Sequence, residues 1–300
     1  SAQPLCKIGL DNLQLFLGND YYVATQLYLY MLNNLDCVKI KLNGIEFSLP
    51  GIKITPVGFK DNDALLPYPK NVYSGYRILQ EFFCFPDAFL FLDIKGFDSL
   101  PQETLINEIE LIFRFNKPLP GDCRITASSL KLHCVPAANL FEHNAEPVHL
   151  SGKRLTYPLK ASHKKPEHFE IFTVLKVDGW LSEHLDKTGI RSKGELRSYH
   201  AFESFRHDIE FEKKKAMRYF KVGVANSLNF SGFEHNISFF RGDEPLTVRN
   251  DEVISVTMLC TNRHLPAELG IGDIYLPLGE SPSWLSYKNI TLPSRTLRPL

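Results

Sequence analysis

The stretch I-S-V-T-M-L-C at residues 254–260 has an apolar side chain at every second position: Ile254, Val256, Met258 and Cys260. Successive side chains of a strand point to opposite faces of a sheet, so this spacing predicts a strand with one buried face. The same period of two occurs at 109–115, 130–134, 169–177 and 220–224. Such segments, joined by irregular loops, predict a mainly β (α+β) fold with β-sandwich or barrel-like domains and a few peripheral helices.

The segment 20–35 predicts a helix. Asn19 or Asp20 can cap its first turn, because a short polar side chain accepts hydrogen bonds from the free amide groups there. Apolar side chains follow at helical spacing. Farther along, the pair Asn43-Gly44 predicts a two-residue hairpin turn between two short strands.

A second, shorter helix is predicted at 75–85, and Pro86 ends it because proline cannot continue a helix. Arg77 and Glu81 lie one turn apart, and we expect them to pair on the exposed face of this helix. Three aromatic side chains are expected to anchor the helix against the strand that follows: Phe82, Phe83 and Phe85.

The best candidate for a domain boundary is the polar segment 161–167, which interrupts the periodic segments with lysines and a proline. We therefore predict a first β-rich domain at 1–160, which contains both helices, and a second at 168–300. Residues 1–150 carry 12 basic and 16 acidic side chains, whereas residues 151–300 carry 22 and 18. This asymmetry favours two domains.

The whole chain of 300 residues has a formal net charge of zero. Neutrality argues against nucleic acid as a partner, since that binding needs a surplus of Lys and Arg, and against a polybasic membrane anchor. No apolar run reaches the roughly 18 residues of a membrane span. Six cysteines without close pairs predict a reduced, cytoplasmic protein. Low net charge also permits association, including self-association.

The common catalytic motifs are not present in the sequence. Gly270-Ile271-Gly272 begins like a dinucleotide-binding fingerprint, but Tyr275 occupies the position of the third glycine. We predict no catalytic residue, no cofactor and no metal site. The three glycosylation sequons are interpreted as chance matches; they begin at Asn229, Asn236 and Asn289.

Two other functions stay open on the residues alone. One is a metal- or carboxylate-dependent hydrolase, and its clustered candidates are His200, Glu203, His207 and Asp208. The other is a carbohydrate-binding β module that uses exposed aromatic rings, namely Tyr68, Tyr73 and Tyr76.

Longer motifs occur in a fixed order along the chain. They are LPYP at 66–69, SGYRILQEFFCFP at 74–86, FLFLD at 89–93, NLFEHNAEP at 139–147 and LCTNRHLP at 259–266. This order resembles the TssF family, also called VasA or ImpG, whose members are baseplate subunits of the bacterial type VI secretion system. The family continues beyond both ends of this sequence, so we expect the chain to be a central part of a longer protein.

The resemblance implies a non-enzymatic wedge scaffold that binds the other baseplate subunits TssG, TssK and TssE and the VgrG spike, and that supports assembly of the contractile sheath. It also implies a cytoplasmic location, in a baseplate docked at the inner-membrane complex. No catalytic residue is known for the family, so the resemblance implies none in this sequence.

For contacts with partners, we single out five side chains. Tyr68 is held extended between two prolines, and Tyr73 lies in the same aromatic region. The segment 139–147 is polar and loop-like, which favours contact with another protein. Its candidates are Phe141, Glu142 and Glu146.

Overall fold

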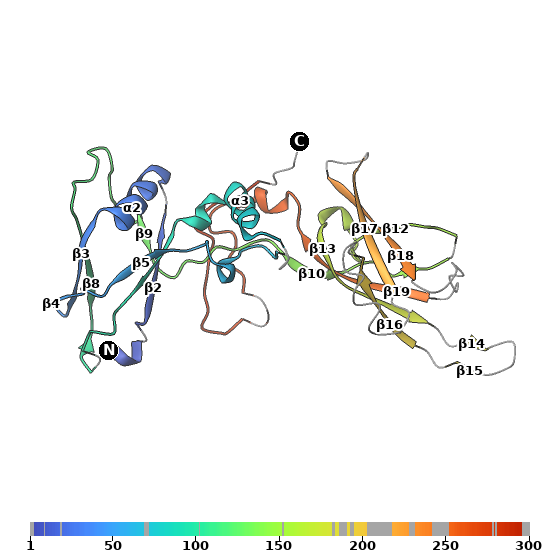
Figure 1. The fold of residues 1–300 in the computed structure, drawn as a ribbon, viewed down its shortest axis with the longest axis horizontal. Helices are drawn as coiled ribbons and strands as arrows, with labels where there is room; N and C mark the ends of the chain where they lie inside the picture. The colour runs from blue at the N-terminus through green and yellow to red at the C-terminus, as the bar shows by residue number, and fades with distance from the viewer. Residues whose placement is uncertain are drawn as a thin grey trace. The chain divides into compact units, whose positions relative to one another are not determined.

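The structure is a computed structural model. It describes residues 3–8, 10–18, 20–68, 72–101, 103–151, 153–181, 184–185, 191–192, 195–202, 218–227, 232–241, 252–277, 279 and 281–295. The chain divides into two compact units, unit 1 at Ser1–Ala138 and unit 2 at Asn139–Arg298. Each unit is built mainly from strands (Figure 1), which confirms the predicted mainly β fold with few helices.

The strands of unit 1 are short and form antiparallel pairs (Figure 1). They are β1 (Gln3–Pro4), β2 (Asn12–Leu17), β3 (Leu35–Leu42), β4 (Ile45–Ser48), β5 (Lys53–Pro56), β6 (Phe91–Lys95), β7 (Leu105–Ile106), β8 (Ile109–Phe115) and β9 (Leu130–Lys131). Among the described residues, one sheet has the strand order β5-β6-β2-β9, another has the order β4-β3-β8, and β1 pairs with β7. Side chains of both larger sheets pack into one core, to which β2 contributes Leu15, β3 Ile40 and β6 Ile94.

The predicted hairpin turn connects β3 to β4. Asn43 and Gly44 have φ angles of 50° and 87°, the left-handed region that these two residue types adopt most readily. The side-chain Nδ2 of Asn43 donates a hydrogen bond to the carbonyl oxygen of Leu105, and its Oδ1 accepts one from the Asn107 N–H. This turn is therefore tied to the loop before β8.

The helices of the described residues are α1 (Leu5–Ile8), α2 (Tyr21–Asn33) and α3 (Ser74–Cys84), and the 3₁₀ turns are η1 (Asp61–Asp63), η2 (Pro86–Phe89), η3 (Pro166–His168) and η4 (Leu265–Glu268). The predicted segments 20–35 and 75–85 coincide with α2 and α3. Asp20 caps α2, and its Oδ1 accepts hydrogen bonds from the N–H groups of Tyr22 and Val23. The inward face of α2 is apolar and buried, with Val23, Ala24, Leu27 and Met31.

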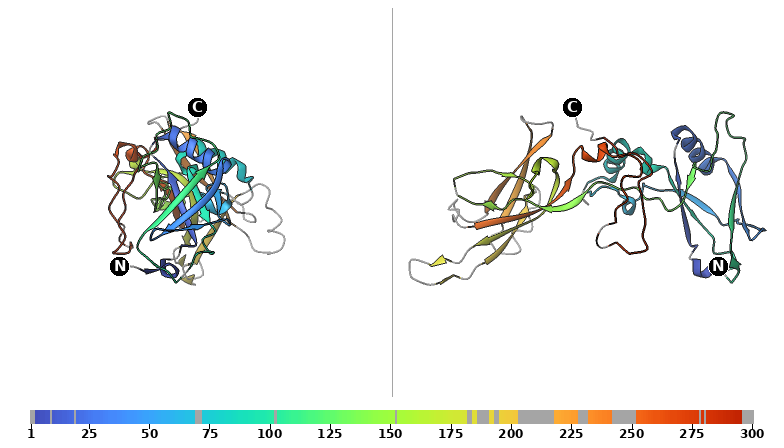
Figure 2. Two further views of the ribbon diagram at one scale, coloured as in Figure 1. Left: turned by 90° about the vertical axis from the view of Figure 1, so that its left-hand side faces the viewer. Right: turned by 180° about the vertical axis from the view of Figure 1, so that it is seen from behind.

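Unit 2 contains the longest strands of the described residues, together with several short ones. They are β10 (Phe141–Asn144), β11 (Val148–His149), β12 (Tyr157–Leu159), β13 (Glu170–Leu181), β14 (His184–Leu185), β15 (Arg191–Ser192), β16 (Glu195–Ala201), β17 (Arg218–Asn226), β18 (Phe233–Arg241) and β19 (Glu252–Thr261). In the described part of the chain, the main sheet has the order β10-β19-β13-β16-β17-β18-β12, and β11 also pairs with β19. The long antiparallel pair β13–β19 is labelled in Figure 1 and is seen from behind in the right-hand view of Figure 2.

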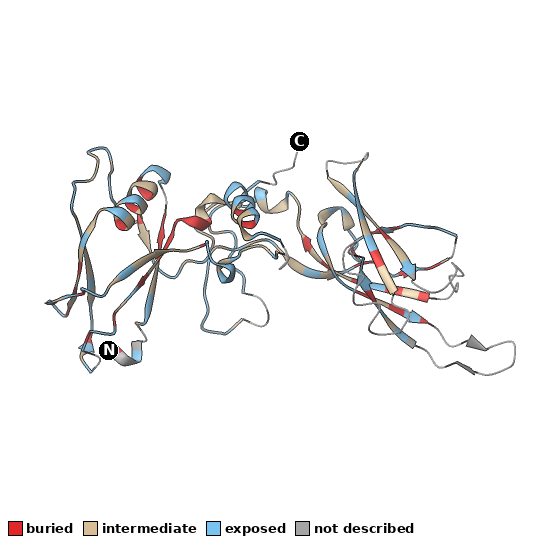
Figure 3. Cartoon of the chain, viewed as in Figure 1, coloured by how far each residue is buried: buried red, intermediate tan, exposed pale blue. Residues whose placement is uncertain are grey.

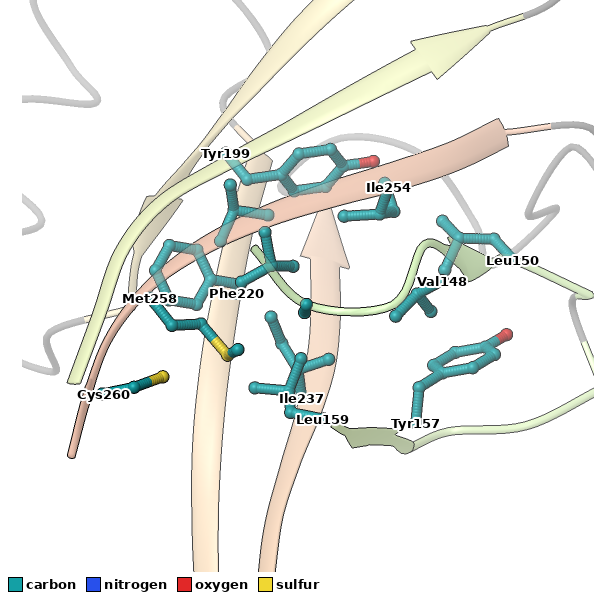
Figure 4. Packing of buried hydrophobic residues seen from close by; sticks show 13 residues of the cluster. Val148, Leu150, Tyr157, Leu159, Tyr199, Phe220, Ile237, Ile254, Met258 and Cys260 are labelled. Carbon is teal, nitrogen blue, oxygen red and sulfur yellow. The ribbon is translucent and has the colours of Figure 1, made fainter. Parts of the chain in front are cut away.

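The core of unit 2 lies inside the curl of this sheet (Figure 4). The alternation at 254–260 correctly predicts one of its strands, because Ile254, Val256, Met258 and Cys260 are completely buried on one face of β19. Strands from the other end of the sheet complete the core, with Tyr157 and Leu159 from β12 and Ile237 from β18. A curled sheet thus buries the apolar side chains of strands that are far apart in sequence.

The division into units differs from the predicted boundary at 161–167. β10 and β11 pair with β19, β12 pairs with β18, and Ala145 forms an isolated bridge with Ala161. The residues from 139 onward therefore belong with unit 2, because their partners are long-range strands that the local sequence does not reveal. That the chain folds as two separate domains stays a prediction.

Candidate protein-docking surface

Helix α3 is short and has no side-chain cap. Tyr73 is the N-cap residue in an extended conformation, and the helix ends at Cys84 before Pro86 starts η2. A side chain at Gly75 would collide with the ring of Tyr73. Glycine at this position therefore lets the Tyr73 ring lie against the first turn of the helix.

The inward face of α3 is charged. Arg77 and Glu81 are each only 2% exposed, and Arg77 Nη1 lies 2.8 Å from Glu81 Oε2. Arg77 also donates hydrogen bonds to the carbonyl oxygens of Gly58 and Lys60, at 3.2 and 3.1 Å. The expectation that this pair lies on the exposed face is wrong.

The second carboxylate oxygen of Glu81 completes this arrangement. Glu81 Oε1 accepts hydrogen bonds of 2.9 Å from the N–H groups of both Leu65 and Leu66. Backbone groups of the segment 58–66 thus satisfy both charged side chains, which is what makes their burial possible. Arg77 Nε is the one buried side-chain atom of the pair without a hydrogen-bond partner.

Because the charged face points inward, the aromatic face of α3 points to solvent, and much of the helix is drawn as exposed in Figure 3. We define the outer face of α3 as four side chains that are 55–75% exposed: Tyr73, Tyr76, Leu79 and Phe83. The expectation that Phe83 anchors the helix is therefore wrong, whereas the ring of Phe82 does contact Phe89 at the end of η2. Phe82 is 43% exposed and Phe83 is 71% exposed, while Phe85 is half-buried.

A groove lies between α2 and α3, beside this face. We call it the α2–α3 groove; it has a volume of about 290 Å³ and is lined by Tyr21, Thr25, Tyr28, Phe59, Ile78, Phe82, Pro86, Phe89 and Leu90. Phe89 lies at its base, and the rings of Phe59 and Phe82 contact it with centroid distances of 5.3 and 5.8 Å. None of the nine lining residues is charged.

Ionisable groups near the groove are affected by burial. Burial raises the pKa of the Tyr28 hydroxyl, and it also raises the pKa of the Asp87 carboxyl next to Pro86. These shifts favour the neutral forms. The uncharged lining of the groove thus suits apolar side chains.

The structure brings two of the five predicted contact residues to this surface. Tyr73 belongs to the outer face of α3 and meets Tyr76 edge to face, with ring centroids 6.1 Å apart. Tyr68 is half-buried, and its hydroxyl donates a 2.7 Å hydrogen bond to the carbonyl oxygen of Tyr73. Tyr68 therefore braces Tyr73.

The other three candidates lie in unit 2. The expected loop is a strand, because Phe141 to Asn144 form β10 and pair with β19. Phe141 packs against the core and meets Phe169 at 5.8 Å, while Glu142 points to solvent. Glu146 is exposed and lines a separate, polar hollow beside β11 and β12.

The motif residues around Asn139 have a structural role. Asn139 Oδ1 accepts a 2.7 Å hydrogen bond from the N–H of Asn262, and the two side-chain amides also bond to each other at 3.2 Å. Arg263 follows with a φ of 55° and donates to the carbonyl oxygen of Glu167. The two sequence motifs that contain these residues thus hold each other in place.

The glycine motif at 270–272 is part of a turn that Asn289 fastens. Asn289 Oδ1 accepts from the N–H groups of Gly272 and Ile274, and Asn289 Nδ2 donates to the carbonyl oxygens of Gly270 and Thr291. Both polar atoms of this amide are in use. The Asn289 side chain of this sequon therefore stabilises the turn through its hydrogen bonds. The glycines belong to this turn and form no phosphate loop.

Of the residues of the alternative hydrolase, the structure describes one. His200 is exposed on β16, and Glu203, His207 and Asp208 lie outside the described residues. Within the described part of the chain, no three His, Cys, Asp or Glu side chains come together as metal ligands. For the alternative carbohydrate module, Tyr73 and Tyr76 stand at 88° to each other, so they form no flat platform for a sugar ring.

Sequence reasoning missed most of the docking surface. Tyr76, Leu79 and Phe83 do recur at helical spacing opposite Arg77 and Glu81. At such a spacing the apolar face of a helix is normally the buried one. The groove residues Tyr21 and Phe59 have no local signal, since tertiary packing alone brings them together.

Among the described residues, no helix is long and apolar enough to cross a membrane.

Comparisons with known proteins connect this fold to one family. The model of the family "Type VI secretion system, TssF" matches residues 2–300. Type VI secretion system component TssF1 of Pseudomonas aeruginosa is 27% identical over 286 residues, which cover 90% of this chain and 44% of that protein. A chain in the cryo-electron microscopy structure of the type VI secretion system TssK-TssF-TssG baseplate subcomplex has a TM-score of 0.68 and 26% identity, over 84% of this chain and 44% of that chain. The chain thus spans less than half the length of these relatives, and it belongs to the TssF family of the type VI secretion system.

Proposed function

We propose that the protein containing this chain is a non-enzymatic structural subunit of the type VI secretion baseplate, and that it acts as a wedge scaffold for other subunits. The observation that carries this proposal is the match of 84% of the chain, with a TM-score of 0.68, to a chain of the TssK–TssF–TssG subcomplex. Extended sheets and an exposed aromatic surface suit a protein that holds partners in position.

The partners that this proposal names first are TssG and TssK, because the matched structure contains them. TssE and the VgrG spike are further candidates by family resemblance. By the same resemblance we propose a cytoplasmic location, in a baseplate docked at the inner-membrane complex. The five contact candidates divide between the units: Tyr68 and Tyr73 serve the α3 surface, while Glu142 and Glu146 offer exposed carboxylates on unit 2. Phe141 packs against the core of unit 2.

Co-purification tests this function. The tagged full-length protein is co-expressed with TssG and TssK of the same genome, and the bound chains are identified by mass. We expect a stable complex that contains both partners. A folded protein that elutes alone, in the presence of folded TssG and TssK, would contradict the proposal.

A further inference from the structure

The outer face of α3 and the α2–α3 groove form one continuous surface. Phe82 lines the groove, and its ring meets that of Phe83 on the outer face at 5.9 Å. A large side chain of this kind can bury about 150–250 Å². Multiplied by their exposed fractions, the four side chains of the outer face together with Phe82, Tyr21 and Phe59 present roughly 800 Å² to solvent. This is about the area that one partner contributes to an interface of standard size.

The shape of the groove fits a helix. One wall is the face of α2 with Tyr21, Thr25 and Tyr28 at positions i, i+4 and i+7, and the other carries Ile78 and Phe82 at i and i+4 of α3. A hollow between two helices accepts apolar side chains that project from a third helix, at the same spacing.

The charges around the groove indicate the chemistry of that helix. Within two residues of the lining residues along the chain, the charges outside the buried Arg77–Glu81 pair are the carboxylates of Asp20, Asp61 and Asp87 and the ammonium group of Lys60. The residues next to the groove lining in the sequence therefore carry a net negative charge. A second copy of this chain, docked face to face, would set these carboxylates against their own equivalents, and that repulsion disfavours a self-contact.

We propose that the outer face of α3 and the α2–α3 groove bind an amphipathic helix of another baseplate subunit, with apolar side chains at i, i+3 or i+4 and i+7 and with Lys or Arg on its flanks. The inference rests on the proposed function and adds the site and the chemistry of the partner. The buried Arg77–Glu81 pair positions the surface, because it keeps the charged face of α3 inward and the aromatic face available.

Photo-crosslinking identifies the occupant. A photoreactive phenylalanine analogue replaces Phe83 in the full-length protein, which is expressed in cells that carry the remaining secretion genes, and the crosslinked peptide is sequenced. We expect a peptide of another baseplate subunit with the apolar spacing and basic flanks stated above. A peptide of a second copy of this chain, an acidic or extended peptide, or no crosslink would overturn the inference.

Two variants separate this inference from the proposed function. F83S is expected to weaken association with the crosslinked subunit about 30-fold, the effect of an interface hot spot. D61K is expected to weaken it less and to reduce its salt dependence. The matched control is L155S, which changes a side chain that is 81% exposed in unit 2 and is expected to bind normally.

If the wild-type protein assembles with TssG and TssK but F83S and L155S bind equally well, this inference fails and the proposed function stands. If the wild-type protein does not assemble with them, the proposed function fails, and the crosslink alone then decides the inference.

Discussion

Helices α2 and α3 bury opposite kinds of face. α2 is capped by Asp20 and packs Val23, Leu27 and Met31 into unit 1. α3 buries Arg77 and Glu81 and turns its aromatic face to solvent. The difference lies in what each helix meets: α2 meets apolar strands, whereas α3 meets backbone carbonyl and amide groups of the segment 58–66. Polarity alone does not decide which face of a helix is buried.

The largest effect is expected from removing one half of the buried pair. Glu81→Ala leaves Arg77 buried without its counter-charge and the N–H groups of Leu65 and Leu66 without their acceptor. We expect a loss of about 3–5 kcal/mol in the free energy of unfolding of unit 1. Equilibrium urea denaturation followed by circular dichroism measures it.

The control for this variant is an exposed ion pair of the same unit. Glu110→Ala removes the partner of Lys41, which lies 3.2 Å away at the surface, and should cost no more than about 1 kcal/mol. Equal losses from the two variants would contradict the account. Both tryptophans, Trp180 and Trp284, lie in unit 2, so an unchanged tryptophan transition in Glu81→Ala would also support two separate domains.

A second test compares matched leucines on the two helices. Leu27 of α2 is 2% exposed, and Leu27→Ala should cost about 2–5 kcal/mol because it leaves a cavity in the core. Leu79 of α3 is 55% exposed, and Leu79→Ala should change the free energy of unfolding by no more than about 0.5 kcal/mol. The same urea titration measures both variants. A large loss from Leu79→Ala would mean that the outer face of α3 is packed.

The smallest effect concerns Asp87, next to the groove residue Pro86. Burial raises the pKa of this carboxyl, so its ionised form is less stable in the folded protein than in the unfolded chain. Asp87→Asn should therefore raise the melting temperature slightly at pH 7. The gain should disappear below the ordinary aspartate pKa of 3.8, where the carboxyl is protonated in both states. Melting curves of both proteins across this pH range test it, and a gain independent of pH would contradict it.

The elements that the sequence predicts are those with a local signal. The alternation of Ile254, Val256, Met258 and Cys260 identifies β19, because a buried sheet face imposes a period of two along one strand. Asp20 and Asn43-Gly44 likewise identify a helix start and a hairpin turn through the conformations they favour. These features need no knowledge of distant residues.

The features that the sequence does not predict depend on distant partners. Phe141 lies in a strand because β10 pairs with β19, more than one hundred residues later, although the alternation of Phe141 and His143 with Glu142 and Asn144 was a weak signal. The inward position of Arg77 depends on backbone groups in the segment 58–66. A period of 3.6 in the sequence shows which residues share one face of a helix. It does not show which face is buried, because that depends on the groups that neighbouring segments offer as contacts.

Hydroxyl-radical footprinting of the free full-length protein, and of its complex with TssG and TssK, tests the orientation and the use of α3 most directly. The account predicts strong oxidation of Tyr76 and Phe83 in the free protein and protection of both in the complex, while Met31 on the buried face of α2 stays protected in both states. Protection of Phe83 in the free protein, or equal oxidation of it in both samples, would contradict the account.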